Sequence, residues 1–375
     1  MDTTSPTTHK EVSKINIKYQ LINGVDTKIP FIRIKEIEDK RILVLNNELF
    51  EIFDVRTNKR ICTIEGEFEK KENNVKRHYD NQFDDFIELK SKDLILWSRG
   101  KIFYYKKFDN KYKLSQVIDE VKQQKNPTKI TQIERVIIYD LYNVVESDNN
   151  ILLSCNSEGI KFYNFINNEY KLDKVIEMFH VRNIIQINPN NSLIIHHNTY
   201  SSTSCIPVSY DRFSLSLFDF NSDKIINNIF EHTTNKDYKI NRTYYKFNYC
   251  LMGDNFIYQI CDYPYYSDIF ENENNVSPLN VNVYNIKKGK NILQIKTPFR
   301  LISYFKDNLI FAKENNRLNV CYFWNNKFIS VYKFDFYFYM NGLCILKNND
   351  LIVWNNENND PYSCHKYSHY KYLNK

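Results

Sequence analysis

Alanine is nearly absent from this chain, with Ala312 as the one example in 375 residues. Alanine has the highest intrinsic helix propensity, so a helix-rich protein would lack its best helix former. Tyr (29 residues) and Phe (26 residues) are abundant instead, and β-branched Ile and Val supply much of the remaining apolar content. These residue types favour strands. The composition therefore predicts an all-β protein.

Glycine is also scarce, with seven residues in the whole chain and no two of them close together. Nucleotide-binding loops and hydrolase nucleophile elbows need closely spaced glycines, because the backbone must approach a phosphate or turn sharply. The sequence contains no GxGxxG, P-loop or GxSxG motif. The common phosphate-loop folds are therefore excluded.

Zinc motifs are missing as well, since the sequence has no CxxC and no HExxH. The densest group of metal-ligand residue types is Cys364, His365 and His369, where Tyr-rich surroundings favour a strand and no fourth ligand lies nearby. We expect no metal and no cofactor. The eight cysteines are scattered, and without a secretion signal they are expected to be reduced and buried.

We expect neither a signal peptide nor a membrane span in this sequence. Residues 1–14 are polar, and no run of 18 apolar residues occurs. The net charge of +6 comes from 51 basic and 45 acidic residues mixed along the chain, whereas nucleic-acid binders usually concentrate their charge. We expect a cytoplasmic protein with no membrane association, with the nucleus as the alternative location. Residues 1–13 are predicted to form a disordered tail before a single domain at 14–375.

A degenerate repeat occurs seven times. Each unit has a short apolar segment, a polar turn rich in Asn and Asp, and a very apolar segment typical of a strand buried on both faces. The very apolar segments are 42–45, 94–97, 151–154, 193–196, 256–260, 309–312 and 351–354. An aromatic alternating segment and a more polar one follow in most units. Four strands per unit joined by short turns predict a blade of a β-propeller, and the chain length suits seven blades of about 40 to 50 residues.

The two ends of the chain favour a closed ring. The last unit has three predicted strands, within 339–354 and 363–373, and then the chain ends. An unassigned alternating segment, 14–22 (KINIKYQLI), precedes the first full unit near Phe31. We predict that this segment supplies the outer strand of the seventh blade, which would remove an exposed sheet edge. The alternative is an extra edge strand, and the uneven spacing of the units leaves six or eight blades as alternatives.

Two segments carry a family resemblance. Residues 49–67 (LFEIFDVRTNKRICTIEGE) resemble the end of a WD-repeat blade, with Phe53 and Asp54 in place of the Trp-Asp dipeptide. Residues 217–226 (LFDFNSDKII) are similar, with Phe218 and Asp219. The other five units lack the dipeptide, and none has the Gly-His pair near its start. The resemblance implies a seven-bladed ring used for protein–protein contacts. A neighbouring propeller family with the same strand order is the alternative.

Two insertions separate the second and third strands of the fourth and fifth units, near 197–212 and 262–278. Long loops in a compact domain are usually functional or disordered. Tyr and Arg are frequent in binding hot spots, and we predict that both insertions lie side by side on one face. The candidate partner-binding residues are Tyr200, Tyr210, Arg212, Tyr263, Tyr265, Tyr266 and Phe270. The alternative is that the insertions are low-complexity loops.

The sequence favours a non-enzymatic scaffold that binds other proteins. A second hypothesis is nucleic-acid binding by a basic, Tyr-rich face, motivated by the alternation of Lys366 with Tyr367 and of Lys371 with Tyr372. A third is a propeller enzyme with a site in its channel. Such a site would combine residues from several blades, and a sequence does not show that convergence.

Overall fold

The computed structural model describes residues 19–38, 40–46, 49–57, 59–65, 83–98, 100–109, 111–120, 143–147, 151–156, 158–178, 181–188, 192–201, 209–219, 222–233, 243–264, 279–297, 299–304, 308–314, 317–324, 327–335, 340–355 and 364–373. All 27 regular elements in these ranges are strands, as the composition predicts. In the same ranges, no helix is long and apolar enough to span a membrane. The predicted tail, 1–13, lies outside the described residues.

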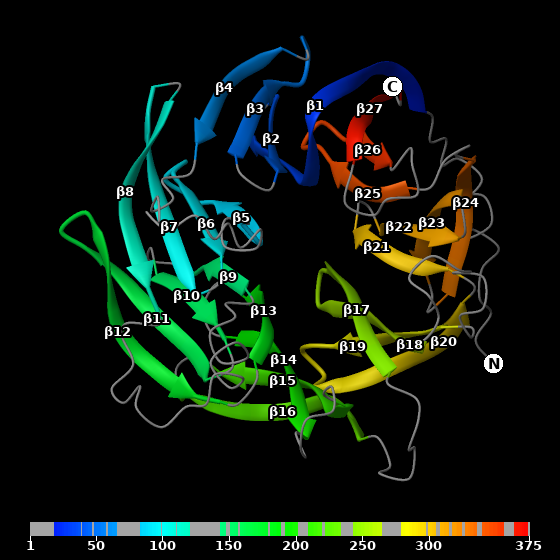
Figure 1. Ribbon diagram of the computed structural model, residues 1–375. Coiled ribbons are helices and arrows are strands. Elements are labelled where there is room, and N and C mark those ends of the chain that lie inside the picture. Colours follow the sequence, from blue (N-terminus) through cyan, green and yellow to red (C-terminus); the bar gives the residue numbers. More distant parts are fainter. Residues whose placement is uncertain are drawn as a thin grey trace. The chain divides into compact units, whose positions relative to one another are not determined.

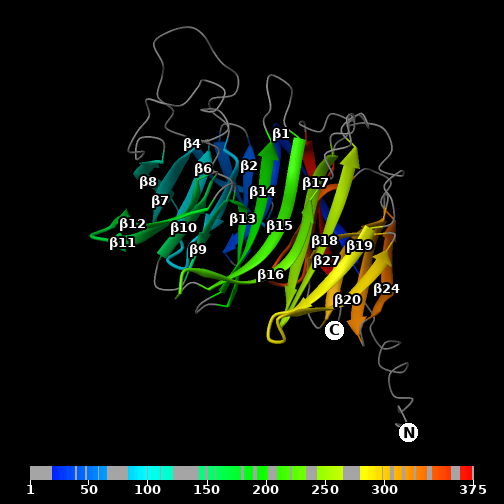
Figure 2. The same ribbon diagram turned by 90° about the horizontal axis from the view of Figure 1, so that it is seen from below.

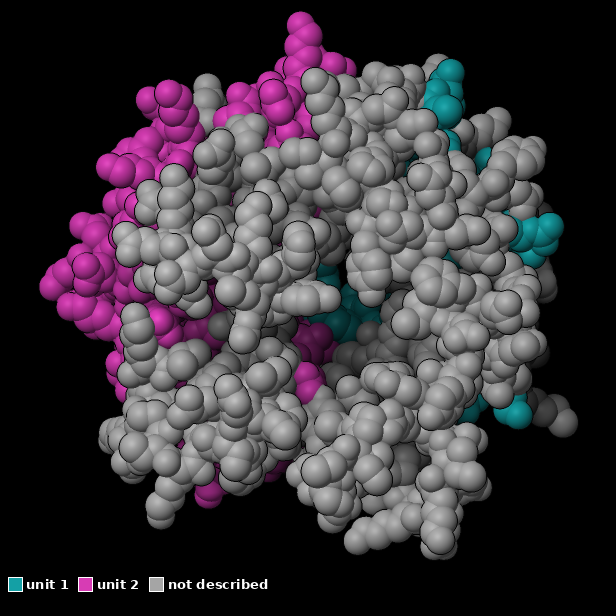
Figure 3. Space-filling view, viewed as in Figure 1, with its two compact units in different colours: residues 1–36, 241–375 teal, residues 37–240 magenta. Residues whose placement is uncertain are grey.

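The chain separates into two compact units, coloured in Figure 3. The first comprises residues 1–36 and 241–375, and the second comprises residues 37–240. We describe each unit by itself.

The second unit contains three complete four-stranded sheets, each with its strands in chain order (Figure 1). All pairings within them are antiparallel. The sheets are β5 (Asp85–Glu88), β6 (Leu94–Ser98), β7 (Lys101–Phe108) and β8 (Lys111–Asp119); β9 (Asn143–Glu146), β10 (Ile151–Cys155), β11 (Gly159–Ile166) and β12 (Glu169–Glu177); and β13 (Val181–Asn188), β14 (Ser192–Ser201), β15 (Ser209–Asp219) and β16 (Lys224–Thr233). The unit also holds β2 (Arg41–Asn46), β3 (Leu49–Asp54) and β4 (Arg60–Glu65).

The first unit contains two complete four-stranded sheets of the same kind. They are β17 (Thr243–Met252), β18 (Asn255–Pro264), β19 (Leu279–Asn285) and β20 (Lys290–Thr297); and β21 (Arg300–Tyr304), β22 (Leu309–Glu314), β23 (Arg317–Trp324) and β24 (Lys327–Asp335). Most of β1 (Tyr19–Glu38) belongs to this unit, together with β25 (Met340–Ile345), β26 (Leu351–Asn355) and β27 (Cys364–Tyr372).

The count of seven separate blades is wrong, because the described strands form six sheets. Five sheets have four strands, and the sixth has seven strands in the order β25-β26-β27-β1-β2-β3-β4. The cause is β1, which continues over 20 residues and neighbours β27 on one side and β2 on the other. The units predicted as first and last therefore share one sheet.

The predicted partner of the N-terminal segment is nevertheless confirmed in the described part of that segment. Tyr19 pairs with Tyr372, and Leu21 pairs with Tyr370, in an antiparallel ladder between β1 and β27. Residues 14–18 of the predicted segment lie outside the described residues. The described start of β1 thus pairs with β27 in one sheet. This is the position predicted for the outer strand of the last unit.

The second strand of the β5–β8 sheet, β6, is continuously apolar because neighbouring sheets cover both of its faces. In β6, all five residues are buried. Leu94 and Leu96 belong to a core cluster with Leu43 of β2, whereas Ile95 belongs to another cluster with Leu152 of β10. Alternate side chains of one strand thus enter two different interfaces. This arrangement explains why this segment reads as a continuous apolar run.

The turns before the second strands use Lys and Asn where glycine would be expected. Lys40 (φ 70°), Lys92 (φ 73°), Asn308 (φ 64°) and Asn349 (φ 69°) all have left-handed backbones. Asn tolerates this region, and Lys occupies it at some cost in strain. A sequence with seven glycines can therefore still form the tight turns of this fold.

Candidate functional site

The predicted binding residues of the first insertion lie in strands. Tyr200 pairs with Tyr210, and Arg212 pairs with Thr199, in the ladder between β14 and β15. The ladder continues to the pair Ser201 and Ser209. The expectation of a loop over 197–212 is therefore wrong for most of its length. The reason is that pairing with a neighbouring strand overrides the weak local preferences of these residues.

The second insertion is described over fewer residues. Tyr263 lies in β18 and pairs with Tyr244 of β17. Tyr265, Tyr266 and Phe270 lie outside the described residues. The first insertion belongs to the second unit and Tyr263 to the first, so the prediction that both insertions share one face stays a prediction.

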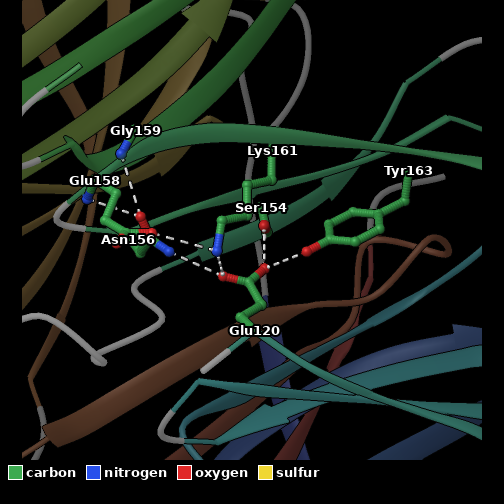
Figure 4. A network of polar contacts seen from close by, with 7 residues as sticks. All are labelled: Glu120, Ser154, Asn156, Glu158, Gly159, Lys161 and Tyr163. Carbon is green, nitrogen blue, oxygen red and sulfur yellow. Dashed lines mark hydrogen bonds and ion pairs between the residues drawn. The ribbon is translucent and has the colours of Figure 1, made fainter. Parts of the chain in front are cut away.

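A network of polar side chains in the described part of the second unit surrounds Glu120, which directly follows β8 (Figure 4). Its carboxylate accepts hydrogen bonds from Tyr163 Oη at 2.9 Å and from Asn156 Nδ2 at 2.9 Å. Lys161 Nζ lies 3.3 Å from Oε2, and Ser154 Oγ donates to Oε1. Glu120 thus connects its own sheet to β10 and β11 of the next.

The position of each donor follows from the strand geometry. Lys161 and Tyr163 are two residues apart in β11, so they lie on one face of it. Ser154 faces Lys161 in the ladder between β10 and β11. Asn156 also caps the turn that follows β10, because its Oδ1 accepts the backbone N–H groups of Glu158 and Gly159. Four donors from one hairpin therefore converge on one carboxylate.

The network is closed to solvent. The side chains of Glu120 and Lys161 are 3% and 6% exposed. Burial, together with the charge of Glu120, raises the pKa of the Tyr163 phenol above its ordinary value. Burial is likewise the main cause of the raised pKa of the neighbouring Cys155 thiol. A satisfied and buried carboxylate has no room for a substrate, so this arrangement can stabilise the contact between two sheets.

A second link joins the same two sheets near their outer strands. The side-chain amide of Gln116 in β8 donates to Tyr170 O at 2.8 Å and accepts from Tyr170 N at 2.7 Å. The amide thereby satisfies both backbone groups of one residue in β12, as a neighbouring strand would do. Glu120 and Gln116 together tie the end of β8 to the next sheet.

The described residues of each unit include the same kind of carboxylate clamp. Asp93 precedes β6, and its two oxygens accept hydrogen bonds from Tyr104 Oη and from Lys107 N, both at 2.8 Å. Asp350 precedes β26 in the same way, and it contacts His369 Nε2 at 3.0 Å and accepts from Tyr372 N at 2.8 Å. In each case the aspartate holds the far end of the third strand to the turn before the second strand.

The clamp also accounts for His369, one of the histidines in the C-terminal group. His369 is 4% exposed, and its ring contacts Asp350. The side chains of Cys364 and His365 are outside the described set. Among the residues that are described, no group of three or more His, Cys, Asp or Glu could hold a metal ion.

The outer strands share one irregularity. The strands β4, β8, β12, β16, β20 and β24 each lie at one edge of a sheet. Each of them has at least one extra residue opposite the preceding strand, which makes a β-bulge. The extra residues are Ile61, Ser115, Asp173, Ile226 and Ile229 (both in β16), Ile292 and Val331. Bulges twist an edge away from regular pairing and protect it from strand addition.

Sequence reasoning missed Glu120, Asp93 and Asp350. Asp93 and Asp350 could have been found from a shared sequence pattern. Each lies in a six-residue segment that begins and ends with Leu, LKSKDL at 89–94 and LKNNDL at 346–351. Glu120 had none, since its partners come from a hairpin more than thirty residues later.

Comparisons with known proteins support the fold. No family model and no curated protein matches this sequence. Among solved structures, 713 chains match. One, titled "Crystal Structure of Mitotic Checkpoint Complex", aligns with a TM-score of 0.59 at 8% identity, covering 99% of this chain and 95% of that chain. Likeness at such low identity shows the fold alone: this chain is an all-β propeller of antiparallel sheets, with six sheets in the described residues, five of them four-stranded.

Proposed function

We propose that this chain is a non-enzymatic, cytoplasmic propeller that acts as a scaffold for other proteins. The observation that carries the proposal is its likeness over 99% of its length to a propeller chain from a protein complex. Two further features support it. The Glu120 network is buried and satisfied, and the six bulged outer strands leave side chains on hairpins and turns, rather than backbone edges, for recognition.

The proposed binding surface is the pair of insertions near 197–212 and 262–278. In the first, the β14–β15 ladder would present Tyr200, Tyr210 and Arg212 on a strand scaffold. Ordered strands lose less conformational entropy on binding than loops do, which favours affinity. Tyr263, Tyr265, Tyr266 and Phe270 would contribute the aromatic part of the second insertion.

Affinity capture with mass spectrometry tests this surface. One variant replaces residues 202–208 with a short Gly-Asn turn, which leaves the Ser201–Ser209 pair intact. A second combines Tyr200→Ser with Tyr210→Ser, and a matched control replaces Tyr112 and Tyr322 with Phe. Loss of specific partners in the first two variants alone is the expected result. An unchanged partner list would show that the surface is assigned wrongly.

Nucleic-acid binding by the C-terminal Lys–Tyr alternation is less well supported. Tyr367 is 1% exposed and packs in the interior, and Tyr372 is half-buried against a core cluster. Stacking on bases requires accessible ring faces. These two tyrosines therefore do not provide the platform on which that hypothesis was based.

A further inference from the structure

The hairpin of β7 and β8 extends past the rest of its sheet. The ladder between β6 and β7 ends at the pair Leu94 and Tyr105, but the ladder between β7 and β8 continues to the pair Phe108 and Lys111. Residues 106–108 and 111–113 therefore form a two-stranded overhang at the end of this hairpin (Figure 1; Figure 2 shows β7 and β8 from below). Asp93 anchors it, because its carboxylate accepts the Lys107 N–H.

Lysines concentrate on one face of this overhang. Lys106 lies opposite Lys113, and Phe108 lies opposite Lys111. Side chains alternate along a strand, so these four residues share a face. Phe108 is 54% exposed, and Lys111 and Lys113 are exposed as well. We call these four residues the basic hairpin face.

The other face of the overhang is packed. Lys107 lies opposite Tyr112, and Tyr112 packs against the core cluster that includes Phe103 and Tyr105. The overhang is thus stabilised by the packing of Tyr112 against the core and by the hydrogen bond from Lys107 N–H to Asp93. The basic hairpin face is consequently presented on an ordered support.

The charge on this face is unbalanced. Directly opposite like charges such as Lys106 and Lys113 destabilise a strand pair. Residues 106–113 contain four lysines, and Asp109 is their one acidic residue. Within the described ranges, no ion pair is formed by Lys106, Lys111 or Lys113. An anionic partner would relieve this repulsion.

We propose that the basic hairpin face binds an acidic, extended segment of a partner protein, with an apolar side chain of that segment covering Phe108. The proposal rests on the scaffold function and names a class of partner for it. Residues at i and i+2 of an extended chain are about 6.6 to 6.8 Å apart, so alternating acidic and apolar residues in the partner would match lysines that flank a phenylalanine.

A protein segment fits this face better than a nucleic acid or a membrane does. Single-stranded nucleic acids stack on successive aromatic rings, but Tyr104 and Tyr105 are 1% and 2% exposed, and Phe108 is the one exposed ring among these. Membrane docking normally needs a larger apolar surface or a second anchoring signal. A single ring between lysines suits a small hot spot.

Fluorescence anisotropy with the full chain tests the proposal. The probe is a fluorescein-labelled peptide of alternating Glu and Leu, with an oligothymidylate and phosphatidylserine vesicles as the other arms. The test variant combines Lys106→Ser, Lys111→Ser and Lys113→Ser. The control combines Lys296→Ser, Lys327→Ser and Lys333→Ser, three exposed lysines of β20 and β24, so the net charge falls equally. Phe108→Ser tests the apolar contact.

We expect the test variant to bind the peptide at least about tenfold more weakly and the control to bind as the wild type does, since each exposed ion pair contributes modestly. Phe108→Ser should weaken binding at unchanged salt dependence. Three results would overturn the proposal: an equal loss of peptide binding in both triple variants, no peptide binding at low salt, or tighter binding of the oligonucleotide or the vesicles. If the peptide does not bind at low salt, the lysines would merely protect an edge strand. Captured partners that depend on the insertions would still support the scaffold function, whereas no partner for any variant would refute that function itself.

Discussion

The Nζ atom of Lys161 lies 3.3 Å from Oε2 of Glu120, although the two residues belong to different sheets and are almost entirely buried. Three neutral donors from Ser154, Asn156 and Tyr163 complete the carboxylate's shell. A buried ion pair requires such hydrogen bonds, because desolvation of both charges is costly. The pair should therefore be sensitive to the loss of either partner.

Replacing Lys161 with Met leaves the charge of Glu120 buried without its counter-ion. Removing one partner of a buried pair costs about 3–5 kcal/mol of unfolding free energy. Urea denaturation followed by circular dichroism measures the loss. Lys287→Met, which removes the exposed pair with Asp254, is the control and should cost less than about 1 kcal/mol. Similar losses in both variants would mean that the Glu120 network does not stabilise the fold.

Replacing Asp93 with Ala should destabilise the second unit. The substitution leaves the Tyr104 hydroxyl and the Lys107 N–H without their acceptor, at a cost of about 1–3 kcal/mol for each buried group that water cannot reach. Asp350→Ala removes the equivalent clamp in the first unit and should behave alike. Asp254→Ala, which removes an exposed pair with Lys287, serves as the control. Hydrogen exchange should show faster opening at Lys107 and at Tyr372, respectively, and unchanged protection would contradict the role of the clamp.

Gly159 should not tolerate Ala. Its φ is +147°, and an added Cβ would lie 2.0 Å from Ile176 O and 2.8 Å from Met178 N, both of them backbone atoms. Gly253 has φ +56° with nothing within 4 Å of an added Cβ. Gly253→Ala should therefore lower the free energy of unfolding only by the cost of a left-handed backbone at Ala, about 1–2 kcal/mol. Thermal unfolding should therefore show a much larger loss for Gly159→Ala. Equal melting temperatures would refute the close approach at Gly159.

Stability should fall at alkaline pH. Burial raises the pKa of Cys344 to about 11 and that of Cys250 to about 12, from an ordinary value of 9.0. It also raises the pKa of the Tyr163 and Tyr258 phenols above their ordinary 10.0. The unfolded chain loses these protons first, so the stabilisation is complete below pH 9 and is lost as pH rises through the raised values.

Urea midpoints between pH 7 and pH 11 measure this loss. Cys344→Ala and Cys250→Ala should each flatten the decline above pH 9, whatever they do to stability at neutral pH. Tyr258→Phe should flatten it above pH 10. Parallel pH curves for all three variants and the wild type would show that these groups do not control alkaline unfolding.

Sequence patterns predicted the strands well and their grouping less well. The continuous apolar run at β6 and the alternation at β8 follow from how many faces of each strand are covered. The β14–β15 hairpin was predicted as an insertion because its Ser and Thr residues lack an apolar pattern, and pairing with a neighbouring strand overrides such weak local preferences. The number of sheets was missed because nothing in the sequence of β1 shows that one strand continues past a blade boundary.

The sequence by itself determined that this chain is all-β, lacks the glycine-rich loops of common nucleotide-binding enzymes, and repeats one pattern of strands. Those properties depend on composition and on local periodicity, which neighbouring residues carry. Tertiary structure decided that β1 joins two predicted units, that Glu120 meets Lys161, and that Asp93 supports the overhang bearing the basic hairpin face. Each of these depends on contacts between segments distant in the chain, which form only when packing brings whole sheets together.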